Sequence, residues 1–231
     1  MAYQSKNFEY TNAEEYDNRG KSSIVENYVL GLWQPFLKNT IAGLSDDKIV
    51  VDLGCGTCEY AASAKAARKI YAVDISEEML VTCRKKLENF EQAEIINSPV
   101  ENFMPSVLAD LVITIGIWEY ANLGKLYEKI RNITKSGSKV IVVFPNIYND
   151  LNWMRSLANW RMVAMRPGFI KKLFKNDFTL VDSASFGTVF WFPKKLQFLI
   201  KPIWKLEDSF WKPFQKFLPI GINVYYLFER K

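Results

Sequence analysis

Between about residues 48 and 144, short β-branched runs alternate with stretches of helical periodicity. Three of the runs, IVVDL, DLVITI and KVIVVF, are apolar throughout instead of alternating with polar residues. Such runs are typical of parallel strands, because crossover helices cover both faces of a parallel sheet. The sequence therefore predicts an α/β fold with a mostly parallel sheet and helices on both faces.

The expected strands are Ile49–Leu53, Lys69–Val73, Glu94–Asn97, Asp110–Ile115 and Lys139–Phe144, with two more near Phe178–Phe186 and Val224–Glu229. Ser76 is the expected N-cap of a helix that carries acidic residues in its first turn and basic residues at its end. Apolar spacing predicts further helices over Leu123–Ile133 and Asp150–Arg166, and one or two within residues 1–45.

The residue types that are missing narrow the chemistry. The chain of 231 residues is 49% hydrophobic, which suits one domain with a full core, and it has no histidine. Ser-His-Asp hydrolases, Cys-His proteases and H-E-x-x-H metalloproteases are therefore excluded. Cys55, Cys58 and Cys83 are too few for a disulfide framework, and the single C-x-x-C has no second pair for zinc, so we expect no metal.

Charge and hydropathy indicate where the chain acts. Lys and Arg total 30 against 25 Asp and Glu, which gives a net charge of +5 without a basic repeat, so we expect no nucleic-acid partner. The apolar stretches are much shorter than the roughly 18 residues that span a bilayer, and the first residues lack an apolar signal core. We expect a cytoplasmic protein.

The text IVVDLGCGTCEY suggests a ligand site. Asp52 lies near the end of a buried strand, and Gly54 and Gly56 follow where the chain turns toward a helix, so the backbone can approach a ligand closely. Asp74 ends the next strand, where a carboxylate can accept hydrogen bonds from ribose hydroxyls. Glu59 breaks the G-x-G-x-x-G pattern of dinucleotide enzymes, and Asp52 suits a ligand with an ammonium group. The alternative, that Asp52 only caps a helix and the glycines only turn the chain, leaves Asp74 unexplained.

These motifs resemble those of the class I S-adenosylmethionine-dependent methyltransferases, in particular the type 11/12-like enzymes that act on small molecules. The resemblance covers residues 45 to 145 well. It implies a Rossmann-like seven-stranded sheet, mostly parallel with the last strand antiparallel, plus N-terminal helices and a C-terminal aromatic insertion. It also implies S-adenosylmethionine as cofactor and S-adenosylhomocysteine as product. The single domain would comprise a helical lid (1–45), a cofactor-binding core (46–146) and a C-terminal part (147–231) with an acceptor cap at 187–220.

The resemblance places the cofactor residue by residue. Asp52, Gly54 and Gly56 would lie beneath its methionine part, and Asp74 would bind its ribose. SPVENF resembles the loop after the third strand, and TIGIWEY the end of the fourth. The implied cofactor-binding residues are Tyr16, Asp52, Gly54, Cys55, Gly56, Asp74, Ile75, Met79, Val100, Glu101, Ile115 and Gly116. In two positions the chain departs from the family: Cys58 replaces the usual third glycine, and Pro99 replaces an acid that would accept from the adenine amino group. We expect both changes to alter affinity.

Methyl transfer from a sulfonium requires few catalytic side chains, because the cofactor already carries the activation. If the acceptor is a hydroxyl or an ammonium, a base must remove a proton, and without histidine the candidates are Glu119 and Tyr120, with Tyr16 behind them. Each of these residues could instead be a simple loop or packing residue. The expected acceptor is an apolar or amphipathic small molecule.

Residues 187–220 form the most unusual segment, with nine Phe or Trp, six Lys and only two acids. The segment could cap an apolar acceptor pocket, contact a membrane surface or a lipid through residues 190–217, or pack as a core insertion with a solvated lysine face. A different hypothesis for the whole chain is a catalytically degenerate scaffold that docks on a membrane or a protein partner. Binding of S-adenosylhomocysteine would distinguish this scaffold from an enzyme.

Overall fold

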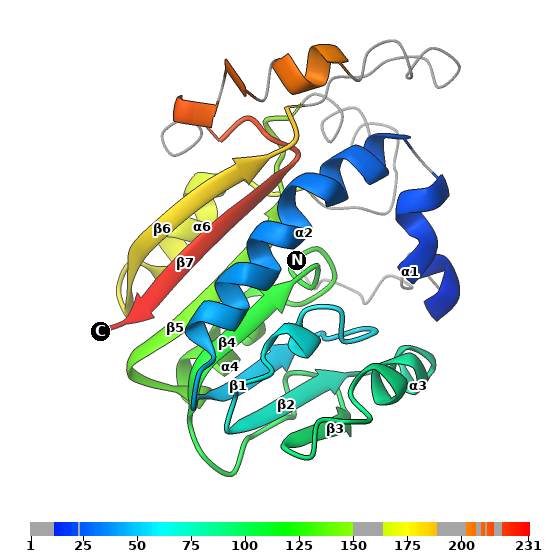
Figure 1. The fold of residues 1–231 in the computed structure, drawn as a ribbon. Helices are drawn as coiled ribbons and strands as arrows, with labels where there is room; N and C mark the ends of the chain where they lie inside the picture. The colour runs from blue at the N-terminus through cyan, green and yellow to red at the C-terminus, as the bar shows by residue number, and fades with distance from the viewer. Residues whose placement is uncertain are drawn as a thin grey trace.

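The computed structural model describes residues 12–22, 24–149, 164–188, 202–206, 209–210, 212–214 and 219–231. Its elements, in chain order, are α1 (Ala13–Ser22), α2 (Ile24–Leu44), β1 (Ile49–Leu53), η1 (Ala61–Ser63), β2 (Lys69–Asp74), α3 (Glu77–Lys86), β3 (Ala93–Asn97), β4 (Ala109–Ile115), α4 (Leu123–Ile133), β5 (Thr134–Pro145), α6 (Pro167–Phe174), β6 (Phe178–Phe186), η3 (Lys212–Phe214) and β7 (Asn223–Arg230) (Figure 1). None of the described helices is long and apolar enough to cross a membrane.

The strands form one seven-stranded sheet in the order β3-β2-β1-β4-β5-β7-β6. Strands β1 to β5 run parallel, and β7 lies antiparallel between β5 and β6. The predicted fold class, a mostly parallel Rossmann-like sheet whose last strand is antiparallel, is confirmed. Because all five residues of β1 are buried, the apolar run that predicted a doubly covered strand has the expected cause.

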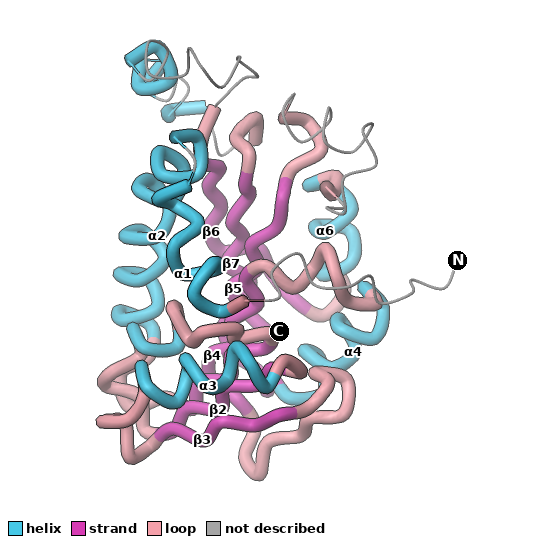
Figure 2. The backbone as a smooth tube through the Cα atoms, turned by 90° about the vertical axis from the view of Figure 1, so that its right-hand side faces the viewer, coloured by secondary structure: helices cyan, strands magenta, loops and turns pink. Residues whose placement is uncertain are grey.

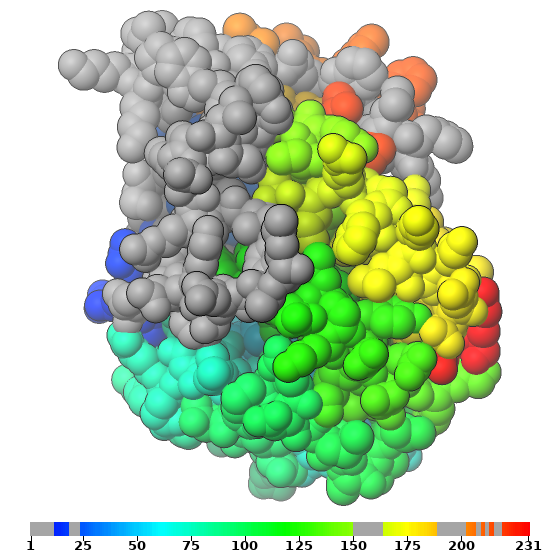
Figure 3. Space-filling view, turned by 180° about the vertical axis from the view of Figure 1, so that it is seen from behind, coloured from blue at the N-terminus to red at the C-terminus, as the bar shows by residue number. Residues whose placement is uncertain are grey.

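Helices cover both faces of the sheet. Helices α2 and α3 pack on one face, and α4 and α6 pack on the other, as the edge-on view shows (Figure 2). Figure 3 shows the second face, where α4 and α6 lie beside each other. In α4 the side chains of Leu126, Ile130 and Ile133 are fully buried, and Asn122 caps the helix by accepting a hydrogen bond from the Lys125 N–H at 3.1 Å.

Most predicted elements lie within two residues of their expected bounds, but two of them differ and one helix was not predicted. Strand β5 begins at Thr134 and not at Lys139, because the chain enters it directly from α4 and its pairing with β4 shifts register near Ala109. The predicted helix Asp150–Arg166 falls largely outside the described residues, and at its end the prediction is wrong, since Met165 forms a bridge with Asn146. Helix α6 was not predicted; it begins with Pro167 at its first turn.

The cysteines also differ from expectation. Cys58, in the turn after β1, forms a disulfide with Cys83 of α3, and their Cα atoms are 4.8 Å apart. Three cysteines cannot build a framework of bridges, but two of them can still pair when a helix packs directly on the turn. The expectation of no disulfide framework therefore missed one bridge.

The segment between β6 and β7 is anchored by an aromatic residue. Trp204 is fully buried, and its ring lies 5.8 Å from the ring of Tyr28 in α2. Its neighbours Ile203 and Leu206 are 47% and 71% exposed, and Phe210 is 65% exposed. One side of this segment therefore packs on the core while the other carries apolar residues in contact with solvent.

Replacement of Trp204 by Ala should lower the free energy of unfolding by about 3 kcal/mol, because it leaves a cavity against α2. Phe210→Ala should change it by less than about 0.5 kcal/mol, because that ring is already largely exposed. Urea denaturation followed by circular dichroism measures both values. Equal losses for the two variants would contradict the anchoring role of Trp204.

Candidate functional site

The carboxyl ends of β1, β2, β3 and β4 meet at one edge of the sheet, because these four strands are parallel neighbours (Figure 1). The strand order reverses between β1 and β4, since β2 and β3 continue on one side and β5 on the other. Ligands of open α/β sheets bind at such a reversal, where the loops after the strands separate. The predicted site residues from Asp52 to Tyr120 lie at this edge or in the loops after it.

The turn after β1 needs glycine for two different reasons. Gly54 has a φ of 73°, and a Cβ atom there would lie 2.8 Å from Cδ1 of Ile117. Gly56 has a φ of 53°, but a Cβ atom there would meet nothing within 4 Å. Gly54 therefore allows the turn to pack against the loop after β4, whereas Gly56 borders open space that a ligand can enter.

Asp74 joins the end of β2 to this turn. Its Oδ2 accepts a hydrogen bond from the Gly56 N–H at 2.8 Å, and its Oδ1 accepts one from the Ser76 N–H at 2.9 Å. Burial raises the pKa of this carboxyl, and the backbone N–H donors oppose that rise. Each carboxylate oxygen has a second lone pair, so Asp74 can still accept from two hydroxyls of a ligand.

The carboxylate of Asp52 is buried, and one of its oxygens can accept a further hydrogen bond. The residue is 3% exposed, and among the described residues its Oδ2 has no hydrogen-bond partner. Burial, with a smaller contribution from the Asp74 carboxylate, raises the pKa of Asp52 to about 7, although a backbone hydrogen bond from Ala61 lowers it. A buried acceptor without a donor is costly, and a ligand cation placed there would relieve that cost.

The remaining predicted cofactor residues lie in sequence close to Asp52 and Asp74 or near the ends of β3 and β4. Ile75 follows Asp74 with half of its side chain exposed, Gly116 follows β4 with a φ of 69° and open space at its Cα, and Glu101 is half-buried. The other members of the predicted set, Cys55, Met79, Val100 and Ile115, are buried. Glu119 and Tyr120, the candidate bases, are half-buried in the turn after β4, where the Tyr120 N–H donates to the Ile117 carbonyl at 3.0 Å.

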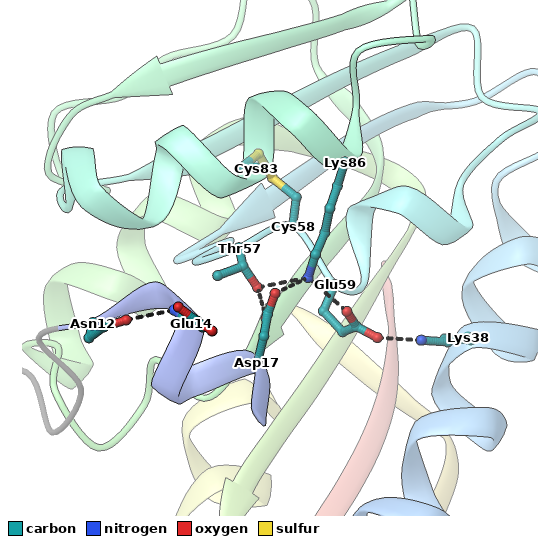
Figure 4. Close-up of polar contacts among 9 residues, drawn as sticks. All are labelled: Asn12, Glu14, Asp17, Lys38, Thr57, Cys58, Glu59, Cys83 and Lys86. Carbon is teal, nitrogen blue, oxygen red and sulfur yellow. Dashed lines mark hydrogen bonds and ion pairs between the residues drawn. A yellow bond between two sulfur atoms is a disulfide. The ribbon is translucent and has the colours of Figure 1, made fainter. Parts of the chain in front are cut away.

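Helix α1 contacts the site through a polar network that the sequence analysis missed. The ammonium group of Lys86, at the end of α3, lies 2.8 Å from Asp17 of α1, 2.9 Å from Glu59 and 3.1 Å from Thr57 Oγ1 (Figure 4). The Thr57 hydroxyl donates to Asp17 at 2.6 Å, and Lys38 of α2 pairs with Glu59. Burial alone would raise the pKa of Glu59, but the two lysines hold it below its ordinary value. Helices α1, α2 and α3 and the turn after β1 meet here, and no local sequence pattern predicts a contact between such distant segments.

Tyr16 precedes Asp17 in α1 and is half-buried, so the network fixes the helix that carries it. The arrangement offers a glycine turn with open space, a carboxylate able to accept from vicinal hydroxyls, and a second carboxylate with one oxygen that has no donor among the described residues. It therefore fits a nucleoside ligand that also carries an ammonium group. That description defines a nucleoside-binding α/β protein.

Comparisons with known proteins narrow the class. Residues 50–137 match the family model described as "Methyltransferase domain". An uncharacterized protein of Methanocaldococcus jannaschii is 30% identical over 170 residues, which are 74% of this chain and 71% of that protein. The chain belongs to the class I S-adenosylmethionine-dependent methyltransferases.

Solved structures share the fold at low sequence identity. The magnesium protoporphyrin IX methyltransferase of Synechocystis PCC 6803 with bound S-adenosylhomocysteine has a TM-score of 0.67 at 13% identity, covering 96% of this chain and 97% of that one. The N-methyltransferase NodS of Bradyrhizobium japonicum WM9, also with S-adenosylhomocysteine, has a TM-score of 0.64 at 10% identity, covering 92% and 90%. Both support the Rossmann-like architecture that the sheet defines.

The affinity for S-adenosylhomocysteine should rise about tenfold from about pH 6 to about pH 8, because the raised pKa of Asp52 leaves its carboxyl mostly protonated at the lower value. The ligand's ammonium group stays charged over this range and prefers the ionised carboxylate. Calorimetric titration at several pH values measures the profile. Asp52→Asn should weaken binding at the higher pH and flatten the profile, and a flat profile in the unmodified protein would contradict this role.

Proposed function

We propose that this protein transfers a methyl group from S-adenosylmethionine to an oxygen or nitrogen atom of an apolar or amphipathic small molecule. The proposal depends chiefly on Oδ2 of Asp52, which has no hydrogen-bond partner in the described part of the chain, is buried beside the glycine turn and suits the ammonium group of the cofactor. When bound, the cofactor supplies an activated methyl group on a sulfonium. The protein's own residues then bind, orient and exclude water.

Each proposed cofactor contact has a support in the fold. Asp74 would accept from the ribose hydroxyls, Gly56 would leave room for the ligand, and the half-exposed Ile75 would pack on the adenine ring. Val100 and Glu101, after β3, would flank the ring, and Ile115 and Gly116, after β4, would border the sulfonium. Helix α1, tied to Thr57 and Lys86 through Asp17, would act as a lid that carries Tyr16.

For an acceptor that must lose a proton, Glu119 is the proposed base, with Tyr120 as the alternative. Both residues follow β4 at the edge where Asp52 and Asp74 lie. A carboxylate near the methyl donor would take a hydroxyl or ammonium proton as the acceptor attacks.

Asp74→Ala should weaken S-adenosylhomocysteine binding at least tenfold, because it removes the ribose acceptor and also frees the Gly56 N–H. Asp110→Ala is the matched control, since this aspartate accepts from the Ile49 N–H at the opposite edge of the sheet. Calorimetry should give near-normal affinity for the control. If S-adenosylhomocysteine does not bind the unmodified protein, the degenerate-scaffold hypothesis replaces the enzyme.

The exposed apolar side of the C-terminal segment favours an acceptor at a membrane surface. Ile203, Leu206, Phe210 and Phe214 are 47–71% exposed, while Trp204 anchors the segment to α2. Residues 187–220 carry six lysines and two acids, a net charge of +4, which complements anionic lipid headgroups. We therefore propose that this segment rests on an anionic bilayer and that the acceptor is lipid-like.

The purified protein should sediment with vesicles that contain phosphatidylglycerol, less with pure phosphatidylcholine, and less again at high salt. Leu206→Ser combined with Phe210→Ser should reduce sedimentation at least fivefold, because about 1.5–3 kcal/mol of apolar burial is lost per side chain. Val107→Ser is the control, since Val107 is 53% exposed just before β4, at the opposite edge. Equal binding by all three proteins would contradict membrane contact and leave a soluble acceptor.

A further inference from the structure

The three cysteines of this chain form a cluster next to the proposed cofactor site. All three are buried, and their sulfur atoms lie within 4.8 Å of one another. Cys58 and Cys83 form the disulfide, and Cys55 remains a free thiol. The two bonded residues are 25 positions apart in sequence, and they join the glycine turn to α3.

The disulfide acts on the same two elements that shape the site. Cys58 lies two residues after Gly56, whose N–H bonds to Asp74, and α3 begins three residues after Asp74. The disulfide therefore ties the segment that follows Gly56 to the helix that follows Asp74.

A second set of contacts depends on the same alignment. Thr57 and Glu59 flank Cys58, and both contact Lys86, which lies three residues after Cys83 in α3 (Figure 4). Lys86 also pairs with Asp17 of α1. The covalent bond thus holds the turn and α3 in the relative position in which Lys86 also contacts α1.

The backbone conformation at Cys58 favours a change in the turn once the disulfide is broken. Cys58 has a φ of 61°, in the left-handed region that is unfavourable for a residue with a Cβ atom. Such a conformation persists only where the surroundings enforce it. The disulfide is one of these constraints, so its loss frees the turn to relax.

We infer that Cys58–Cys83 is a redox modification site that controls cofactor affinity: the disulfide form holds the turn for binding, and reduction by a dithiol weakens binding. The dithiol supplies two electrons and two protons, the S–S bond breaks, Cys58 and Cys83 become thiols, and the dithiol becomes a disulfide. This inference relies on the proposed function, because its readout is cofactor binding.

The experiment compares the protein oxidised with diamide and reduced with dithiothreitol. Alkylation and mass spectrometry count the thiols, which should be one and three, and calorimetry with S-adenosylhomocysteine should show at least about fivefold weaker binding after reduction. Because the coupling is reciprocal, bound S-adenosylhomocysteine should raise the dithiothreitol concentration needed for reduction by the same factor. Circular dichroism confirms that the reduced protein stays folded.

Three variants sharpen the result. Cys83→Ala should bind as weakly as the reduced protein in both conditions. Cys58→Gly also lacks the bond, so it should bind as weakly as the reduced protein and should not respond to dithiothreitol, although glycine adopts the left-handed conformation readily. Thr82→Ala, the neighbouring change in α3, should keep the full response to dithiothreitol.

The inference is overturned if the oxidised protein shows three alkylatable thiols, if reduction leaves the affinity unchanged, or if Cys83→Ala still responds to dithiothreitol. If neither the oxidised nor the reduced protein binds S-adenosylhomocysteine, both this inference and the proposed function are wrong. A count of one thiol would then show that the disulfide exists while the ligand assignment has failed.

Discussion

The hydrogen bond from the Gly56 N–H to the Asp74 carboxylate holds the site together. It spans 18 residues of sequence and joins the turn after β1 to the end of β2, which are neighbours only because the two strands pair in parallel. It acts together with the Gly54 and Cys55 N–H groups, which donate to the Val73 carbonyl at 2.8 and 3.0 Å and hold the same turn against β2. The open space beside Gly56, the Asp52 Oδ2 that has no partner among the described residues, and the contact between α1 and Thr57 all depend on where that turn lies.

The two buried carboxylates explain why a ligand is needed at this position. Burial, with a smaller contribution from the Asp74 carboxylate, raises the pKa of Asp52 to about 7, so the stability of the fold falls as pH rises from about 4 to about 7. A structural pair would be expected to recruit a lysine or arginine, as Glu59 does with Lys38 and Lys86. Asp52 has no such partner among the described residues, so a bound cation is the natural compensation, and it stabilises the fold most where the carboxyl would otherwise ionise.

The sequence was sufficient for the parts of the fold that local patterns encode. Fully apolar runs identified the central strands and Ser76 identified the start of α3, while the acid-glycine spacing predicts the cofactor edge. The Lys86 network and the Cys58–Cys83 bond were not predictable, because their members come from α1, the glycine turn and α3, whose packing appears in no local spacing. Helix α6 was missed because its eight residues are too few for a clear apolar period, although Pro167 in its first turn is a helix-start signal.

The order of the last strands determines where the aromatic insertion leaves the sheet. β6 ends at Phe186 and β7 begins at Asn223, and these two residues are paired at the edge where β5 ends. Gly221 fits there because a Cβ atom would lie 2.5 Å from the Phe186 backbone, and Ser185 Oγ accepts from the Gly221 N–H at 2.9 Å. An insertion with its two ends fixed in this way must leave the sheet at the carboxyl edge of the parallel strands. The described ends of this insertion, residues 187–188 and 219–222, therefore lie at the same edge of the sheet as Asp52 and Asp74.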